Sequence, residues 1–194
     1  MKKLIFILFF LISLSTIAQQ KKSEKEERIS KEEMPQKALL FLRNFENNKT
    51  KKNRFYFEID SEKKGYEAKF KIASFLYSVE FGEKGNLQDI EIVKDFDSIN
   101  PLAKKTIQTY FKENYAKFNV EKVQLQFKKQ RTETEKETYN RAINHRRNKP
   151  DYYEFIVKVK IQKERKRLEI LFDSSGNFKK QREIAESSYD YFMY

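Results

Sequence analysis

Two stretches with the same layout constrain the fold of this chain more than any other feature. Tyr77–Ile92 (YSVEFGEKGNLQDIEI) and Leu168–Ile184 (LEILFDSSGNFKKQREI) each alternate apolar and polar residues up to a polar loop that ends in Gly-Asn. Strict alternation is typical of a strand with one buried face. Glycine, and less easily asparagine, adopts the positive φ angles that hairpin turns require. We therefore predict two β-hairpins, which turn at Gly85, Asn86, Gly176 and Asn177.

Each hairpin ends a similar series of predicted elements. A helix with an apolar face starts near Pro35 and runs to about Phe45, and a second starts at Pro101, with proline in the first turn of each. Alternating strands follow each helix. The sequence thus predicts an α+β fold, a tandem repeat of a helix plus a four-stranded antiparallel sheet. It should contain about eight strands, with the helices on one face.

The ends of the chain differ from this pattern. Two lysines precede the apolar run Leu4–Ile12, and small residues end at Ala18, which is typical of a secretory signal peptide cleaved after Ala18. The predicted parts are a signal peptide (1–18), a solvated tether (19–29), a first repeat (30–94), a second repeat (98–185) and an aromatic tail (186–194). The tail either packs on the sheet or acts as a docking peptide. The mature protein should be periplasmic or secreted, with no stable membrane span.

The second repeat is longer than the first because it contains a basic insertion at 128–150. This segment carries eight Lys/Arg and three Glu, and its few apolar residues include Tyr139 and Ile143. It could be a long hairpin tip, although Tyr139, Ala142 and Ile143 have helical spacing. We favour a mobile loop with a helical piece, outside the core. Its cations indicate either contact with an acidic partner or a solvated loop with no role.

Residue types that carry catalysis or bind cofactors are scarce. The net charge is +12 over 194 residues, cysteine is absent, and the only histidine, His145, lies between Asn144 and Arg146. Nearby cations disfavour proton or metal binding by this histidine. The four glycines belong to predicted turns, and no phosphate-binding glycine loop follows a strand. We expect a non-enzymatic protein with no catalytic residues, no cofactor and no metal.

The predicted order of elements resembles the PepSY-like, beta-lactamase-inhibitor-like family of secreted bacterial proteins. The likeness rests on the proline-started helix at 100–115, on YEAKFK at 66–71 and YEFIVKV at 153–159, and on LFDSSGNF at 171–178. It spans roughly residues 30–185. The first hairpin lacks the aspartate of the family turn, and the basic insertion departs from the pattern. The resemblance implies a binding or inhibitory module that acts through the exposed face of its sheet.

The residues that alternate with the apolar strand positions should form that exposed face. We expect partner contacts there and on the insertion, from Tyr56, Lys69, Lys71, Gln124, Gln126, Ile156, Lys158, Lys160, Arg146 and Arg147. A sheet with tyrosine and lysine suits an unidentified envelope or extracellular protein. The alternative is an anionic polymer such as lipopolysaccharide or an acidic glycan, since the chain is strongly basic. Secretion argues against intracellular nucleic acid.

Overall fold

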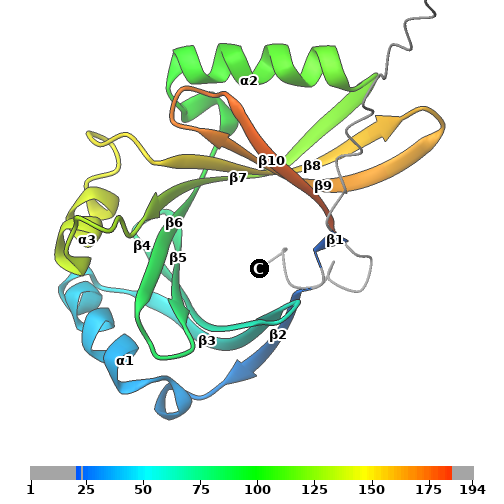
Figure 1. Ribbon diagram of the computed structural model, residues 1–194. Coiled ribbons are helices and arrows are strands. Elements are labelled where there is room, and N and C mark those ends of the chain that lie inside the picture. The colour runs from blue at the N-terminus through cyan, green and yellow to red at the C-terminus, as the bar shows by residue number, and fades with distance from the viewer. Residues whose placement is uncertain (1–20, 23, 185–194) are drawn as a thin grey trace, which may run out of the picture.

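The computed structural model of this protein describes residues 21–22 and 24–184, whose strands form a ten-stranded sheet (Figure 1). The strands are β1 Lys21–Lys22, β2 Glu24–Ile29, β3 Lys51–Asp60, β4 Lys63–Ile72, β5 Phe75–Gly82, β6 Leu87–Lys94, β7 Lys117–Lys128, β8 Tyr152–Ile161, β9 Glu164–Asp173 and β10 Phe178–Ile184. The α-helices are α1 Gln36–Leu42, α2 Pro101–Asn114 and α3 Glu135–Ile143. Short 3-10 helices cover Lys31–Glu33, Arg43–Asn48 and Phe96–Ser98.

Strands β2 to β10 lie side by side in chain order, each antiparallel to the next. The sheet curls so strongly that its far ends approach each other (Figure 1). Arg182 Nη1 on β10 lies 2.5 Å from Asp60 Oδ2 on β3. Strand β1 pairs in parallel with β10, while β2 pairs with β3. One N-terminal segment therefore borders both edges of the sheet.

The helices cover the convex side of the sheet (Figure 1), and the hydrophobic core lies between the helices and the sheet. Helix α1 contributes Ala38 and Phe41, and helix α2 contributes Ala103, Ile107 and Phe111. These side chains pack on the apolar positions of the strands, such as the Phe111 ring, whose centroid is 5.6 Å from that of Phe155. The predicted α+β class and the placement of helices on one face are confirmed.

Local signals in the sequence account for the helix starts and the turns. Asn100 caps α2 by accepting hydrogen bonds from the backbone N–H groups of Leu102 and Ala103, and Pro101 occupies the first turn as predicted. Gly85 and Gly176 have φ angles of 74° and 88°, which confirms the two predicted turns. Each half contains a helix followed by four strands, α1 with β3 to β6 and α2 with β7 to β10, although α3 lies between β7 and β8. The internal duplication itself stays a prediction.

The predicted tether at 19–29 is wrong for the residues that the structure describes. Lys21–Lys22 forms β1 and Glu24–Ile29 forms β2, which pairs along its whole length with β3. The segment lacks a periodic apolar pattern because it is an edge strand with little core contact. Its conformation is set by hydrogen bonds to β3, which the sequence of the segment does not encode.

The basic insertion is not a mobile loop outside the core. Thr134 and Glu137 form a capping box at the start of α3, and Thr138, Tyr139 and Ala142 are buried. The ring centroid of Tyr139 lies 4.9 Å from that of Phe45. The helical piece is therefore confirmed, and the prediction that the insertion stays out of the core is wrong. Helix α3 packs against β6 and β7, and its few apolar residues are enough to join the core.

The predicted signal peptide and aromatic tail lie outside the described residues. Within the described part of the chain, no helix is both long enough and apolar enough to cross a membrane.

Candidate functional site

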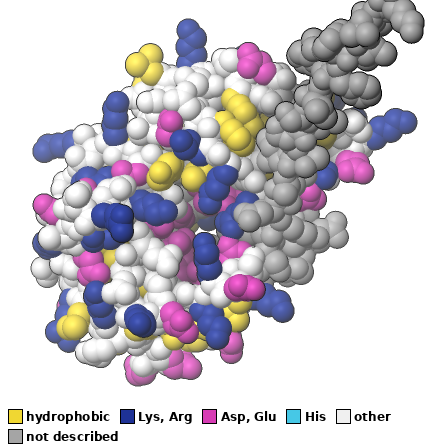
Figure 2. Space-filling model, viewed as in Figure 1, with side chains coloured by type: hydrophobic (Ala, Val, Ile, Leu, Met, Phe, Trp, Pro, Cys, Tyr) yellow, Lys and Arg dark blue, Asp and Glu magenta, His cyan; other side chains and the backbone are white. Residues whose placement is uncertain are grey.

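The concave side of the sheet forms a polar cavity of about 430 Å³. Its lining comes from strands β2 to β10, at the positions that alternate with core residues. On β7, for example, Val123 and Leu125 are in the core, while Gln124 and Gln126 face the cavity. Figure 2 shows acidic side chains within this hollow and basic side chains around it. Strand periodicity thus separates an apolar core on one face from a charged site on the other.

Six lysines of the cavity lining form what we call the lysine rim: Lys63, Lys64, Lys122, Lys128, Lys179 and Lys180. Lys122 is half-buried and the other five are exposed. Within the described residues, none of the six lysines has a carboxylate within ion-pair distance. The cations of the cavity that do form ion pairs are Lys69 and Arg182. The rim therefore presents positive charge to whatever approaches the cavity.

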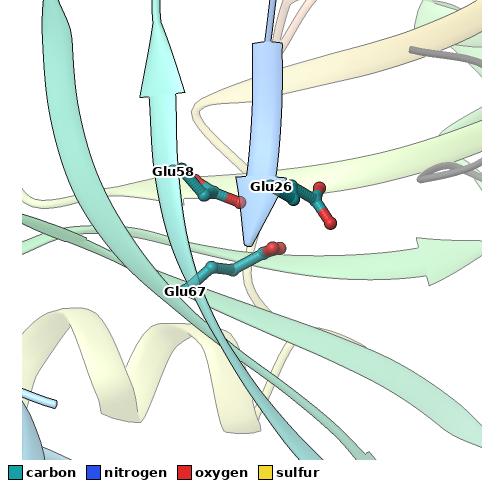
Figure 3. Close-up of side chains that lie close together, drawn as sticks. All are labelled: Glu26, Glu58 and Glu67. Atoms are coloured by element: carbon teal, nitrogen blue, oxygen red, sulfur yellow. The ribbon is translucent and has the colours of Figure 1, made fainter. Parts of the chain in front are cut away.

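Below the rim lie two carboxylate clusters, and the first contains its own cation. It consists of Glu26, Glu58 and Glu67 on the adjacent strands β2, β3 and β4, with one oxygen of each within 4.8 Å of the others (Figure 3). Lys69 Nζ lies 2.9 Å from Glu26 Oε1 and 2.7 Å from Glu67 Oε2. Burial opposes the charge of Lys69, but Glu67 and Glu26 outweigh this and raise the pKa of Lys69. This lysine offsets part of the negative charge of the cluster.

The second cluster consists of Glu80 on β5 and of Asp89 and Glu91 on β6. One oxygen of each again lies within 4.8 Å of the other two. Glu80 and Asp89 are direct partners across the strand pair, an arrangement in which like charges destabilise a sheet. Within residues 24–184, none of the three has a lysine or arginine at ion-pair distance, in contrast to the first cluster.

Asp89 and Glu91 of this second cluster are buried, Glu80 is half-buried, and all three carboxyl groups are hard to ionise. Burial raises the pKa of Asp89 to about 7, with a further contribution from the charge of Glu154. Burial also raises the pKa of Glu80, helped by Asp89, and that of Glu91, helped by Glu154. Such groups either hold protons at neutral pH or bind a cation. The local fold therefore contains a charge conflict of the kind that marks functional sites.

Amide groups from β7 hold part of the second cluster in place. Gln124 Nε2 donates to Glu91 Oε2, and Gln126 Nε2 donates to Glu91 Oε1 at 3.2 Å and to Asp89 Oδ2 at 3.4 Å. The remaining oxygen, Asp89 Oδ1, is buried and has no hydrogen-bond partner. Asp89 itself is 5% exposed, and polar atoms buried to this extent normally have a hydrogen-bond partner.

The structure divides the predicted contact residues among several places. Lys69, Gln124 and Gln126 line the cavity, and Tyr56 lies beneath Lys69, whose Nζ is 4.8 Å from the ring centroid. Lys71 lies on β4, as Lys69 does, but is not part of the cavity lining. The prediction of an exposed Ile156 is wrong, because this side chain is 1% exposed.

The remaining predicted residues lie away from the cavity. Arg146 and Arg147 are exposed at the end of the α3 segment, where the Arg146 guanidinium is 5.5 Å from the Phe75 ring centroid. Lys158 and Lys160 line a separate, open hollow of about 700 Å³, which we call the outer basic patch. Its basic residues are Lys117, Lys158, Lys160, Arg165, Lys166 and Arg167.

Sequence reasoning missed Asp89, Glu91, Glu26 and Arg182 as cavity residues. The two acids on β6 alternate with Ile90 and Ile92, and this signal was sufficient to place them on the exposed face. Glu26 could not be found, because its segment has no alternating apolar residues that would predict a strand. Arg182 reaches the cavity only because the sheet curls back onto Asp60.

Comparisons with known proteins show a shared fold at low sequence identity. No family model and no curated protein sequence matches this chain. A DUF2874 family protein from Bacteroides ovatus is 14% identical with a TM-score of 0.51, over 77% of this chain and 87% of that one. A proposed periplasmic protein from Bacteroides eggerthii is 12% identical with a TM-score of 0.51, over 80% and 94%.

A BLIP-like protein from Bacteroides fragilis is 14% identical with a TM-score of 0.48, over 77% of this chain and 86% of that one. The predicted link to PepSY-like proteins stays a prediction. The likeness to the proteins from Bacteroides ovatus and Bacteroides eggerthii nevertheless identifies the architecture, and this chain has the fold of those two solved structures.

Proposed function

We propose that this chain is a periplasmic or secreted binding module that takes an acidic segment of a protein partner onto its concave face. Its function is to bind this partner or to inhibit it, and it catalyses no reaction. The observation that carries this proposal is the lysine rim, which exposes positive charge that no carboxylate of the described chain pairs with. Lysines placed in this way attract and orient an acidic partner.

A comparison of the two faces of the sheet favours the concave face as the binding surface. The convex face is already covered by helices and carries the hydrophobic core. The concave face is polar and open at the rim, and its 430 Å³ can receive several side chains of an inserted loop. The family resemblance and the signal peptide predicted from the sequence support a module of the cell envelope. The periplasmic description of the Bacteroides eggerthii protein supports the same location.

A peptide-binding measurement tests this proposal. A fluorescent peptide of alternating Glu and Gly is titrated with the mature chain, and its Gln/Gly analogue serves as the uncharged reference. The double variant Lys64→Gln/Lys180→Gln removes two exposed rim charges, one from β4 and one from β10. At about 0.5–1 kcal/mol for each lysine, affinity for the acidic peptide should fall roughly five- to thirtyfold.

The matched control is Lys105→Gln/Lys112→Gln, which removes two exposed charges from α2 on the convex side. It should change the affinity less than about twofold, because α2 lies on the side of the sheet away from the cavity and salt screens charges over ~8 Å. Equal losses in both double variants would mean that only net charge matters. Equal affinity for the acidic and the uncharged peptide would refute the proposal.

The outer basic patch favours a second candidate function, the binding of an anionic polymer. Lys117 lies directly opposite Lys160, and Lys160 directly opposite Arg165, across β7, β8 and β9. Like charges in this register destabilise a sheet unless an anion offsets them. If the patch binds a polymer, Lys160→Gln/Arg165→Gln should weaken binding to heparin and reduce its salt dependence by about two released ions. The rim double variant should leave heparin binding unchanged.

A further inference from the structure

We infer that Glu80, Asp89 and Glu91 form a binding site for a calcium ion on the floor of the concave cavity. The inference is independent of the proposed partner, because an ion can bind this cluster with or without a protein on the rim. It starts from two separate observations: three carboxylate oxygens converge, and one buried carboxylate oxygen lacks any partner.

The spacing of the oxygens suits calcium. An oxygen from each of the three carboxylates lies within 4.8 Å of the other two. A calcium ion bonds oxygen at about 2.3–2.6 Å, so two of its ligands can lie up to roughly 5 Å apart. The three side chains come from paired strands, so the sheet itself holds them in place. Glu80 faces Asp89 across β5 and β6, and Glu91 follows Asp89 by two residues on the same face.

The unpartnered oxygen points to a missing ligand. Asp89 is 5% exposed, and its Oδ1 accepts no hydrogen bond, while its Oδ2 has only the 3.4 Å contact with Gln126. Leaving a buried oxygen of this kind unsatisfied costs ~1–3 kcal/mol for a neutral group and more for a charged one. A cation among the three carboxylates would supply the missing interaction.

In the first carboxylate cluster, a lysine of the chain itself offsets the repulsion among three close carboxylates. There, Lys69 Nζ lies between Glu26 and Glu67 and makes ion pairs with both. The second cluster has the same number of carboxylates and the same close approach, but no lysine or arginine of residues 24–184 occupies the equivalent place. A bound cation would make the two clusters electrostatically alike.

The donor atoms select the class of ion. The cluster offers carboxylate oxygens, with neither histidine nor cysteine, and hard cations prefer such ligands. Turning over the side-chain amide of Gln126 would add a fourth oxygen, since the amide already touches Asp89 and Glu91. Magnesium requires shorter bonds and a stricter octahedron, whereas calcium accepts irregular sets of six to eight oxygens. Water would complete the set from the open side of the cavity.

Calorimetric titration of the mature chain with CaCl2 in the absence of any partner tests the site. We expect one ion per chain, with a Kd of about 10⁻⁴–10⁻³ M, as in extracellular calcium modules, and weaker binding of MgCl2. Glu80→Gln and Asp89→Asn should each weaken calcium binding at least tenfold. The matched control, Glu58→Gln, removes a carboxylate from the first cluster and should change the Kd less than threefold.

Melting with a chelator present separates loss of binding from loss of folding. Without calcium, Glu80→Gln and Asp89→Asn should melt at or above the temperature of the wild type, because each removes a repelled carboxylate. Added calcium should raise the melting temperature of the wild type and of Glu58→Gln, but not that of these two variants. No saturable binding to the wild type, or undiminished binding to folded Asp89→Asn, would overturn the inference, whatever the acidic peptide does.

Discussion

Replacing Gly176 by alanine should destabilise the protein more than any other single-methyl change in its turns. Gly176 has a φ of 88°, and a Cβ atom there would lie 2.5 Å from the carbonyl oxygen of Ala103 and 3.0 Å from its Cα. Both atoms belong to the backbone of α2, so no side-chain rotation can relieve the overlap. The turn of the β9–β10 hairpin therefore sits against the start of α2 in a space that only glycine fits.

The magnitude follows from three effects. A positive φ costs a non-glycine residue about 1–2 kcal/mol. Inserting a methyl group against fixed backbone costs roughly 1–3 kcal/mol. The alanine also lowers the conformational entropy of the unfolded chain, which stabilises the folded protein by about 0.4–1 kcal/mol. The net loss is about 1–5 kcal/mol, and for a chain of this size each kcal/mol lowers the melting temperature by roughly 2–4 °C.

Thermal unfolding followed by circular dichroism measures this loss, with Gly82→Ala as the control. Gly82 lies at the end of β5 without a positive φ, and its added Cβ would meet only the movable end of the Gln88 side chain, 3.2 Å away. The control should melt within ~3 °C of the wild type. If Gly176→Ala melts as late as the control, the turn does not pack under α2 as described.

Three further predictions concern buried groups on the two faces of the sheet. Burial, and then the charge of Lys94, lowers the pKa of His145, so the unfolded chain binds its proton more readily. Wild-type stability should therefore fall relative to His145→Gln as the pH drops below about 6.5, and parallel melting curves would contradict this. Lys69→Met leaves the buried carboxylate of Glu67 unpaired, and chemical denaturation should show a loss of about 3–5 kcal/mol, whereas under ~1 kcal/mol would mean that the pair is not isolated from water. Tyr139→Ala should lower the free energy of unfolding by about 3–5 kcal/mol in the same assay, because the ring packs on Phe45. No loss of stability would mean that the insertion lies outside the core.

The sequence predicted the parts of the fold that depend on neighbours along the chain. Alternation placed Gln124 and Gln126 on one face of β7 and Leu125 on the other, because successive side chains of a strand point in opposite directions. Proline at position 101 and glycine at 176 predicted a helix start and a turn, since each has backbone preferences of its own. These preferences hold wherever the residue lies in the fold.

Contacts between distant residues decided the rest. Arg182 and Asp60 are separated by 122 positions, and only the curl of the whole sheet brings them within 2.5 Å. The same curl turned the expected exposed face into a cavity. Asp89 and Glu91 are buried on this face, and burial raises the pKa of both carboxyl groups. Neither burial nor curvature is a property of a short stretch of sequence, because both arise from strands that meet only after the chain has folded. Asp89 and Glu91 could thus be placed on a face from the sequence, but their charge conflict exists only in the tertiary structure.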